Sequence, residues 1–203
     1  MAEIRNLLID LGDVLYAINP QHTQKRWQAM APQNDGVPFT KEQQHDLFCQ
    51  LDKGEIEIED LADGLIEAYN LQAPPEDVIL AWKELLTGVI PGRVEAIEKL
   101  SQQYQLALLS NTNAYHYSVF KDECEPIFSK LNHVFLSFEM GMRKPDAEIY
   151  ETALESAGWK AEETLFLDDS RPNIEGAAAV GIQTWHVAEY ADFDRMCAQY
   201  LKS

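Results

Sequence analysis

Residues 8–14 read Leu8-Ile9-Asp10-Leu11-Gly12-Asp13-Val14, in which a short apolar run ends in a carboxylate. Four more apolar runs follow, at residues 106–109, 134–136, 164–167 and 183–187. Runs of this length without polar alternation are typical of parallel strands that are buried on both faces. Helical patterns at residues 93–103, 147–157 and 174–180 separate most of them. This alternation predicts an α/β fold with a doubly wound, mostly parallel sheet.

The segment between the first run and Pro91 has a different pattern. Residues 18–88 show no convincing strand, and their clearest feature is the helical period of residues 57–69. Thr40 and Gln43 predict a capping box that opens a helix to residue 51, and Pro74 and Pro75 predict the start of another helix. We therefore predict an α/β core of residues 1–16 and 89–203, with a helical domain of residues 17–88 inserted after the first strand.

The composition limits the classes of partner. Sixteen basic and thirty-four acidic residues give a formal net charge of −18, which repels nucleic acid and anionic lipid surfaces. The three cysteines have no paired spacing, so neither a disulfide framework nor a thiolate zinc site is indicated. The charged start leaves no room for a signal peptide, and no apolar run approaches membrane-spanning length. We expect a cytoplasmic protein that binds neither nucleic acid nor membranes.

Polar side chains follow three of the predicted strands. Asp10 ends the first run, Ser110 follows the second, and Asp168 and Asp169 follow the fourth, while Lys144 lies in the loop after the third. Ligands of open α/β sheets bind beyond the carboxyl ends of the strands, so we expect these groups to meet in one crevice. Singly, an Asp or Ser at a strand end often does no more than cap a turn or the next helix.

The chemistry that suits this set is phosphoryl transfer. A carboxylate nucleophile such as Asp10 must approach phosphorus through negative oxygens, and a divalent ion on Asp10, Asp168 or Asp169 would offset that repulsion. Oxygen ligands favour Mg²⁺. Ser110 and the backbone amides near Asn111 would hold phosphate oxygens, and Lys144 would offset charge on Asp10 and on the transferred group.

In this order, the motifs at Asp10, Ser110, Lys144 and Asp168-Asp169 resemble those of the haloacid dehalogenase-like (HAD) hydrolases over nearly the whole chain. The resemblance implies a Rossmann-like core and a helical cap that closes over the crevice and selects substrate. It implies an aspartyl-phosphate at Asp10, phosphate binding by Ser110, stabilisation of the nucleophile by Lys144, and Mg²⁺ on the acidic pair. Residues 109–113 and 141–145 resemble a bacterial subgroup that includes glucose-1-phosphate phosphatases.

One position departs from the family pattern. Most phosphatases of the family carry a general-acid Asp two residues after the nucleophile, where this chain has Gly12. The Gly12 carbonyl can still bind the metal, whereas Asp13 would point to the opposite side of an extended chain. Three explanations stay open: an acidic leaving group such as an anomeric phosphate, another proton donor such as His116, or slow or lost catalysis.

The sequence thus predicts a magnesium-dependent hydrolase of a small, sugar-like phosphomonoester, acting as a monomer or homodimer on a phosphorylated metabolite. Two alternatives are a catalytically silent binding module with the same fold and a metal-independent 2-haloacid dehalogenase, against which the intact acidic pair counts. Asn173 is a candidate for orienting the site, or else a helix cap. Arg143 is predicted to be a solvated neighbour of Lys144.

Overall fold

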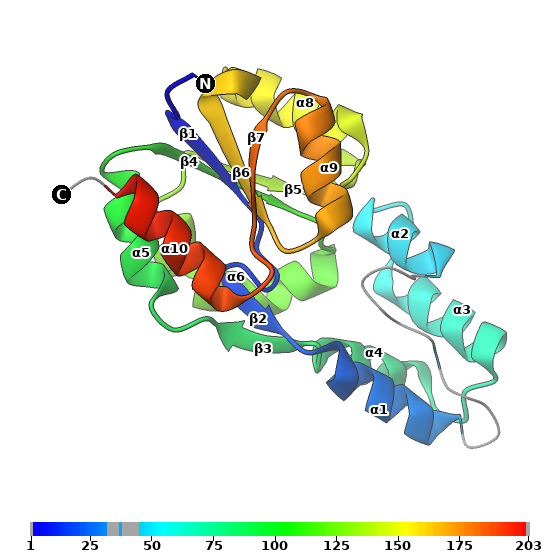
Figure 1. The fold of residues 1–203 in the computed structure, drawn as a ribbon. Coiled ribbons are helices and arrows are strands. Elements are labelled where there is room, and N and C mark those ends of the chain that lie inside the picture. Colours follow the sequence, from blue (N-terminus) through cyan, green and yellow to red (C-terminus); the bar gives the residue numbers. More distant parts are fainter. Residues whose placement is uncertain (1, 32–36, 38–44, 202–203) are drawn as a thin grey trace.

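Five parallel strands form the central sheet in the order β5-β4-β1-β6-β7 (Figure 1). The computed structural model describes residues 2–31, 37 and 45–201. The strands are β1 (Asn6–Ile9), β2 (Tyr16–Ile18), β3 (Leu86–Val89), β4 (Gln105–Ser110), β5 (His133–Leu136), β6 (Thr164–Asp168) and β7 (Gln183–His186). The helices are α1 (Pro20–Met30), α2 (Asp46–Asp52), α3 (Ile58–Tyr69), α4 (Pro75–Lys83), α5 (Arg93–Ser101), α6 (Ala114–Phe128), α7 (Ser137–Met140), α8 (Ala147–Ala157), α9 (Arg171–Ala179) and α10 (Tyr190–Tyr200), with a 3-10 turn at Ala161–Glu163.

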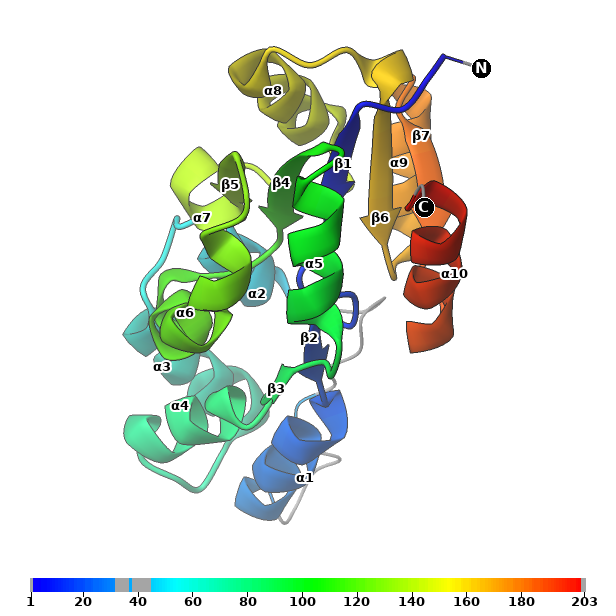
Figure 2. The same cartoon turned by 90° about the vertical axis from the view of Figure 1, so that its left-hand side faces the viewer.

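Helices cover both faces of the sheet, because successive strand residues point to opposite sides. Leu7 and Ile9 of the central strand β1 lie in one buried cluster with side chains of α5, α6 and α10. Leu8, between them, lies in a second cluster with side chains of α8 and α9. Figure 2 shows α5 and α10 on one side of the strands and α8 and α9 on the other. The α/β class and the five strands predicted for the sheet are confirmed.

Helices α1 to α4 pack around a separate cluster of buried side chains. At its centre the rings of Trp27 and Trp82 stack with centroids 5.5 Å apart, and Phe48 lies 5.0 Å from Trp82. This cluster agrees with a helical insertion that has its own core, although the boundaries at residues 16/17 and 88/89 stay a prediction. We call residues 17–88 the helical insertion.

The insertion does contain strand residues, which the sequence analysis did not predict. Strands β2 and β3 pair antiparallel in a two-stranded sheet that joins the insertion to the core, with an irregular register between Ala17 and Ile18. Strand β2 has three residues and β3 has four, and most of their side chains are partly exposed. Such short strands do not produce a recognisable pattern of apolar residues in the sequence.

Most predicted helices are observed with boundaries shifted by a few residues, whereas four helices, α1, α6, the four-residue α7 and α10, were missed. Helix α1 has few apolar residues, helix α6 contains Pro126, and helix α10 was not recognised either. The capping box predicted at Thr40 and Gln43 lies outside the described residues. Within the described ranges, no helix is both long and apolar enough to cross a membrane.

Candidate active site

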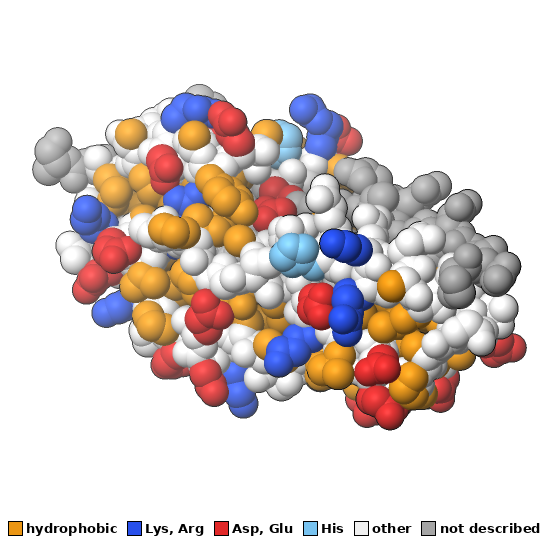
Figure 3. All heavy atoms as spheres, turned by 90° about the horizontal axis from the view of Figure 1, so that it is seen from below, with side chains coloured by type: hydrophobic (Ala, Val, Ile, Leu, Met, Phe, Trp, Pro, Cys, Tyr) orange, Lys and Arg blue, Asp and Glu red, His pale blue; other side chains and the backbone are white. Residues whose placement is uncertain are grey.

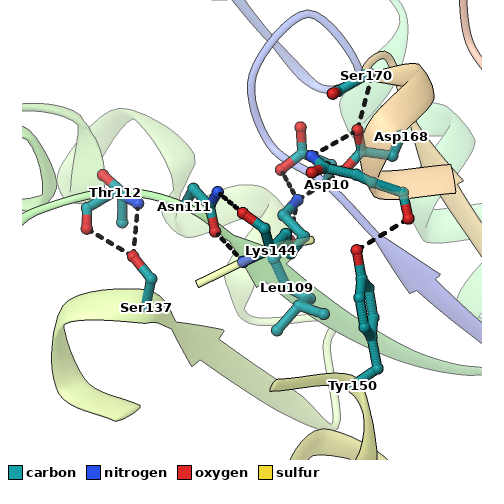
Figure 4. A network of polar contacts seen from close by, with 10 residues as sticks. Asp10, Leu109, Asn111, Thr112, Ser137, Lys144, Tyr150, Asp168 and Ser170 are labelled. Atoms are coloured by element: carbon teal, nitrogen blue, oxygen red, sulfur yellow. Dashed lines mark hydrogen bonds and ion pairs between the residues drawn. The ribbon is translucent and has the colours of Figure 1, made fainter. Parts of the chain in front are cut away.

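Lys144 is the centre of the polar network at the carboxyl ends of β1, β4 and β6 (Figure 4). Its ammonium group donates to Asp10 Oδ1 at 2.7 Å, to Asp168 Oδ2 at 2.6 Å and to the Leu109 carbonyl at 2.8 Å. A lysine ammonium carries three protons, so these contacts use all of its donors. The side chain is 1% exposed, and its nitrogen lies 5.3 Å from the Phe166 ring centroid. Two stretches of chain 134 residues apart thus meet in one buried ion pair.

The electrostatics of this group depend on burial. Burial raises the pKa of Asp10 to about 7, and the neighbouring charges of Asp168 and Asp169 add to the effect although Lys144 opposes it. Burial also opposes the charge on Lys144, but the two carboxylates outweigh it and raise the Lys144 pKa. Three carboxylates lie around one ammonium, so negative charge outnumbers positive charge in this cluster. A further cation therefore favours the ionised form of Asp10.

The carboxylates fit a divalent cation. Ligand atoms of Asp10, Asp168 and Asp169 all lie within 4.8 Å of one another. Asp168 is fully buried and is held in place by the Ser170 amide at 2.8 Å and by Asn173 Nδ2 at 3.0 Å. An oxygen-only donor set with fixed orientation suits Mg²⁺. Asn173 therefore lies where the prediction of an orienting residue requires it.

The loop after β4 holds Lys144 through its backbone. Asn111 Nδ2 donates to the Lys144 carbonyl and Asn111 Oδ1 accepts from the Lys144 amide, both at 2.9 Å. Ser137 makes a similar double contact with the Thr112 amide and carbonyl, at 2.9 and 2.8 Å. The Asn111 side chain thus positions Lys144. Of Asn111, only the backbone amide remains as a predicted phosphate ligand. Ser110 ends β4 and is 3% exposed.

A cavity of about 410 Å³ lies against this network. The core contributes Asp10, Gly12, Asn111, Lys144, Asp169 and Asn173 to its lining, and the helical insertion contributes Ile18, Pro20, Cys49, Asp52, Trp82 and Leu85. Core and insertion therefore enclose one space, with carboxylates and an ammonium on one wall and mostly apolar side chains on the other. Neither Ser110 nor Asp168 is among the described lining residues.

Comparison with known proteins identifies the family of the chain. The family model described as haloacid dehalogenase-like hydrolase matches residues 4–181. The chain belongs to this family. D-ribitol-5-phosphate phosphatase of Bacteroides thetaiotaomicron is 24% identical over 205 residues, 98% of this chain and 100% of that protein. Sesquiterpene phosphatase astK of Aspergillus oryzae is 26% identical over 90% of this chain and 89% of that protein.

A solved structure of a HAD family enzyme from Bacteroides thetaiotaomicron, in complex with magnesium and inorganic phosphate, superposes with a TM-score of 0.81. It is 31% identical and the match covers 90% of this chain and 93% of that one. The predicted family and fold class are confirmed, and the relatives agree with the prediction of a magnesium-dependent phosphatase.

In this HAD hydrolase, neither residue considered as a substitute for the missing acid is placed to act as one. The Asp13 carboxylate accepts from the Ile18 amide at 3.1 Å and from the Tyr190 hydroxyl at 3.3 Å, and it does not appear in the described cavity lining. His116 lines the cavity, but its Nε2 contacts the Trp82 carbonyl at 3.2 Å. Burial lowers the His116 pKa to about 4, so the ring is neutral near pH 7.

Neither backbone conformation nor close packing requires a glycine at position 12. A Cβ built there meets only Ile18 Cδ1, at 3.5 Å, which is ordinary contact, whereas a Cβ on Gly176 of α9 lies 2.5 Å from the Pro145 carbonyl. We expect Gly12→Ala to leave the free energy of unfolding unchanged or to raise it by up to about 1 kcal/mol. Gly176→Ala should lower it by about 1–3 kcal/mol and reduce activity, because the loop that carries Lys144 must move. Urea denaturation of both variants tests this, and equal stabilities would contradict it.

Sequence reasoning did not predict the pair of Arg143 and Asp52 in the cavity wall. Arg143, predicted to be solvated, has a side chain that is only 19% exposed and pairs with Asp52 of α2 at 3.5 Å. Arg143 Nη1 donates to Cys49 Sγ at 3.2 Å. The prediction failed because the position of α2 over the loop buries Arg143, and the only signal in the sequence was its place directly before Lys144.

Proposed function

We propose that this HAD hydrolase cleaves small, sugar-like phosphomonoesters with Mg²⁺ through an aspartyl-phosphate on Asp10. The observation that carries the proposal is the ammonium of Lys144 bound to both Asp10 and Asp168, with Asp169 completing a carboxylate cluster. This arrangement fixes a nucleophile beside a site for a divalent cation. The related enzymes named as phosphatases, and the related structure with magnesium and phosphate, support it.

The proposed reaction has two steps. An Asp10 carboxylate oxygen attacks phosphorus as the bond from phosphorus to the leaving alcohol breaks, and water then attacks phosphorus to release phosphate and regenerate Asp10. Lys144 holds the Asp10 carboxylate in position, while Ser110 and the Asn111 amide are proposed to bind phosphate oxygens. Asp10, Asp168, Asp169 and the Gly12 carbonyl would hold a divalent ion, which would supply charge neutralisation when bound.

The cavity suits a small alcohol as leaving group. Its volume of about 410 Å³ is within the range of small-molecule sites. Asp13 and His116 are engaged elsewhere, so neither of them replaces the missing general acid. An alcohol of low pKa, such as an anomeric hydroxyl, therefore needs the least assistance and should be turned over fastest.

The surface agrees with a metabolite rather than a polyanion as partner. On the face seen in Figure 3, acidic and basic side chains are interspersed and no broad basic area gathers. With a net charge of −18, such a surface offers no favourable field for nucleic acid. The cytoplasmic location and a monomeric or homodimeric state remain predictions.

Magnesium dependence tests the proposal directly. With p-nitrophenyl phosphate, phosphate release should require Mg²⁺, stop when EDTA is added and recover when Mg²⁺ is restored in excess. Because a ligand of the folded state stabilises it, Mg²⁺ alone should also raise the thermal midpoint, and Asp169→Asn should weaken that shift.

Two other results would contradict the proposal. Halide release from a 2-haloacid in EDTA, without phosphatase activity, would favour the dehalogenase. Tight binding of sugar phosphates without turnover across a broad panel would favour the silent binding module.

A further inference from the structure

Asp52 is the charged residue that the helical insertion places in the cavity wall, among the described lining residues. The other described lining residues from the insertion are Cys49 and four apolar residues: Ile18 of β2, Pro20 of α1, Trp82 of α4 and Leu85. Asp52 ends α2, which lies beside the carboxyl-end side of the core in Figure 1. Burying a carboxylate in a mostly apolar wall costs free energy, so Asp52 needs hydrogen-bond or charged partners that offset this cost.

Two groups of the core hold Asp52. Arg143 Nη2 lies 3.5 Å from Asp52 Oδ2, and the Asn113 side chain donates to the same carboxylate. The exposed fractions of the Arg143 and Asp52 side chains are 19% and 14%, so both still reach the cavity. Burial raises the Asp52 pKa to about 6, and Arg143 and Asn113 limit the rise, so the group is mostly ionised at neutral pH. The pair thus presents an oriented acceptor beside an oriented donor.

We propose that the Asp52–Arg143 pair binds hydroxyl groups on the alcohol part of the substrate. The enzyme would then select phosphate esters of uncharged polyols or sugars over those of apolar alcohols. This inference rests on the proposed function and specifies its substrate class. Neighbouring hydroxyls both donate and accept, which matches a carboxylate next to a guanidinium. Because the two charges cancel, an anionic tail gains nothing from the pair as a whole.

The loop geometry gives the pair a fixed distance from the reacting group. Arg143 directly precedes Lys144, whose amide and carbonyl are both held by Asn111. The hydroxyl site and the Asp10 site are therefore built on one constrained loop. Substrates must place a hydroxyl at a set distance from the phosphate, so selection depends on position as well as on polarity.

The test compares three phosphates: D-ribitol 5-phosphate, n-pentyl phosphate, which has the same carbon number without the hydroxyls, and p-nitrophenyl phosphate. The parent enzyme should prefer the polyol phosphate to the pentyl phosphate by about 10–100-fold in kcat/KM, the range expected for hydrogen bonds to charged groups. Asp52→Ala should remove most of that preference and leave turnover of the other two substrates within about threefold. Asp52→Asn, which keeps the shape of the side chain, should lower the preference less.

Glu55→Ala is the matched control, because Glu55 is an exposed carboxylate three residues beyond Asp52 and is absent from the described cavity lining. It should preserve the ratio. Equal loss on pentyl and ribitol phosphates with p-nitrophenyl phosphate retained would overturn the proposal and make Asp52 the proton donor to the leaving group. Equal loss on all three substrates in both Asp52 variants, or no loss on any, would also overturn it. A parent enzyme inactive on p-nitrophenyl phosphate with Mg²⁺ would instead refute the proposed function.

Discussion

Asp10→Asn is expected to abolish phosphate release, with a fall of at least about 10⁴-fold in kcat, as found when a covalent nucleophile is removed. The amide has nearly the same shape and can still accept a hydrogen bond from Lys144, so the site geometry is kept while the attacking oxygen loses its charge. The fold should not suffer, because burial already disfavours the charged form of Asp10. Beryllofluoride, which mimics a phosphoryl group on a carboxylate, should raise the thermal midpoint of the parent and not of the variant.

The matched control for this variant is Asp13→Asn. Asp13 has a positive φ of 53°, which Asn tolerates well, and its carboxylate accepts from the Ile18 amide, which an amide oxygen also does. Its activity should stay within a few-fold of the parent. Turnover in Asp10→Asn equal to that of the parent would refute the covalent mechanism, and an inactive Asp13→Asn would identify Asp13 as the missing acid.

The convergence of distant motifs was predictable because it follows from topology. Short apolar runs separated by helices specify a parallel sheet, and a parallel sheet brings the carboxyl ends of its strands to one edge. Asp10 follows β1, Asp168 ends the adjacent strand β6, and Lys144 lies in the loop between α7 and α8, after β5. This convergence at one edge follows from the parallel arrangement alone and needs no knowledge of side-chain contacts.

What the sequence did not reveal depends on orientation between elements. The pairing of Asp52 with Arg143 requires α2 to lie over one particular loop, and no local periodicity encodes that placement. The same holds for Asn111, whose side chain was expected near phosphate but binds the backbone of Lys144. The local sequence around an Asn after a strand does not distinguish a side chain that faces a ligand from one that hydrogen-bonds a neighbouring loop.

Lys144→Met is expected to have the second-largest effect, on both stability and catalysis. The change keeps a long unbranched side chain but removes a buried charge that pairs with Asp10 and Asp168 at 2.7 and 2.6 Å. Breaking a buried ion pair from one side costs about 3–5 kcal/mol, so urea denaturation without Mg²⁺ should show a loss of that order. Phosphate release should fall by about 10²–10³-fold, because Asp10 loses its positioning donor and becomes harder to ionise.

Added Mg²⁺ distinguishes the charge of Lys144 from its packing. A divalent cation on the carboxylate cluster supplies part of the missing positive charge, so Mg²⁺ should recover stability in Lys144→Met more than in the parent, where Lys144 already neutralises one carboxylate. Lys160→Met is the control, because Lys160 is 67% exposed and its pairing with Glu163 at 3.6 Å is a surface contact of small value. Its stability should change by less than about 1 kcal/mol. Equal losses of stability in the two variants would show that Lys144 does not hold the network together.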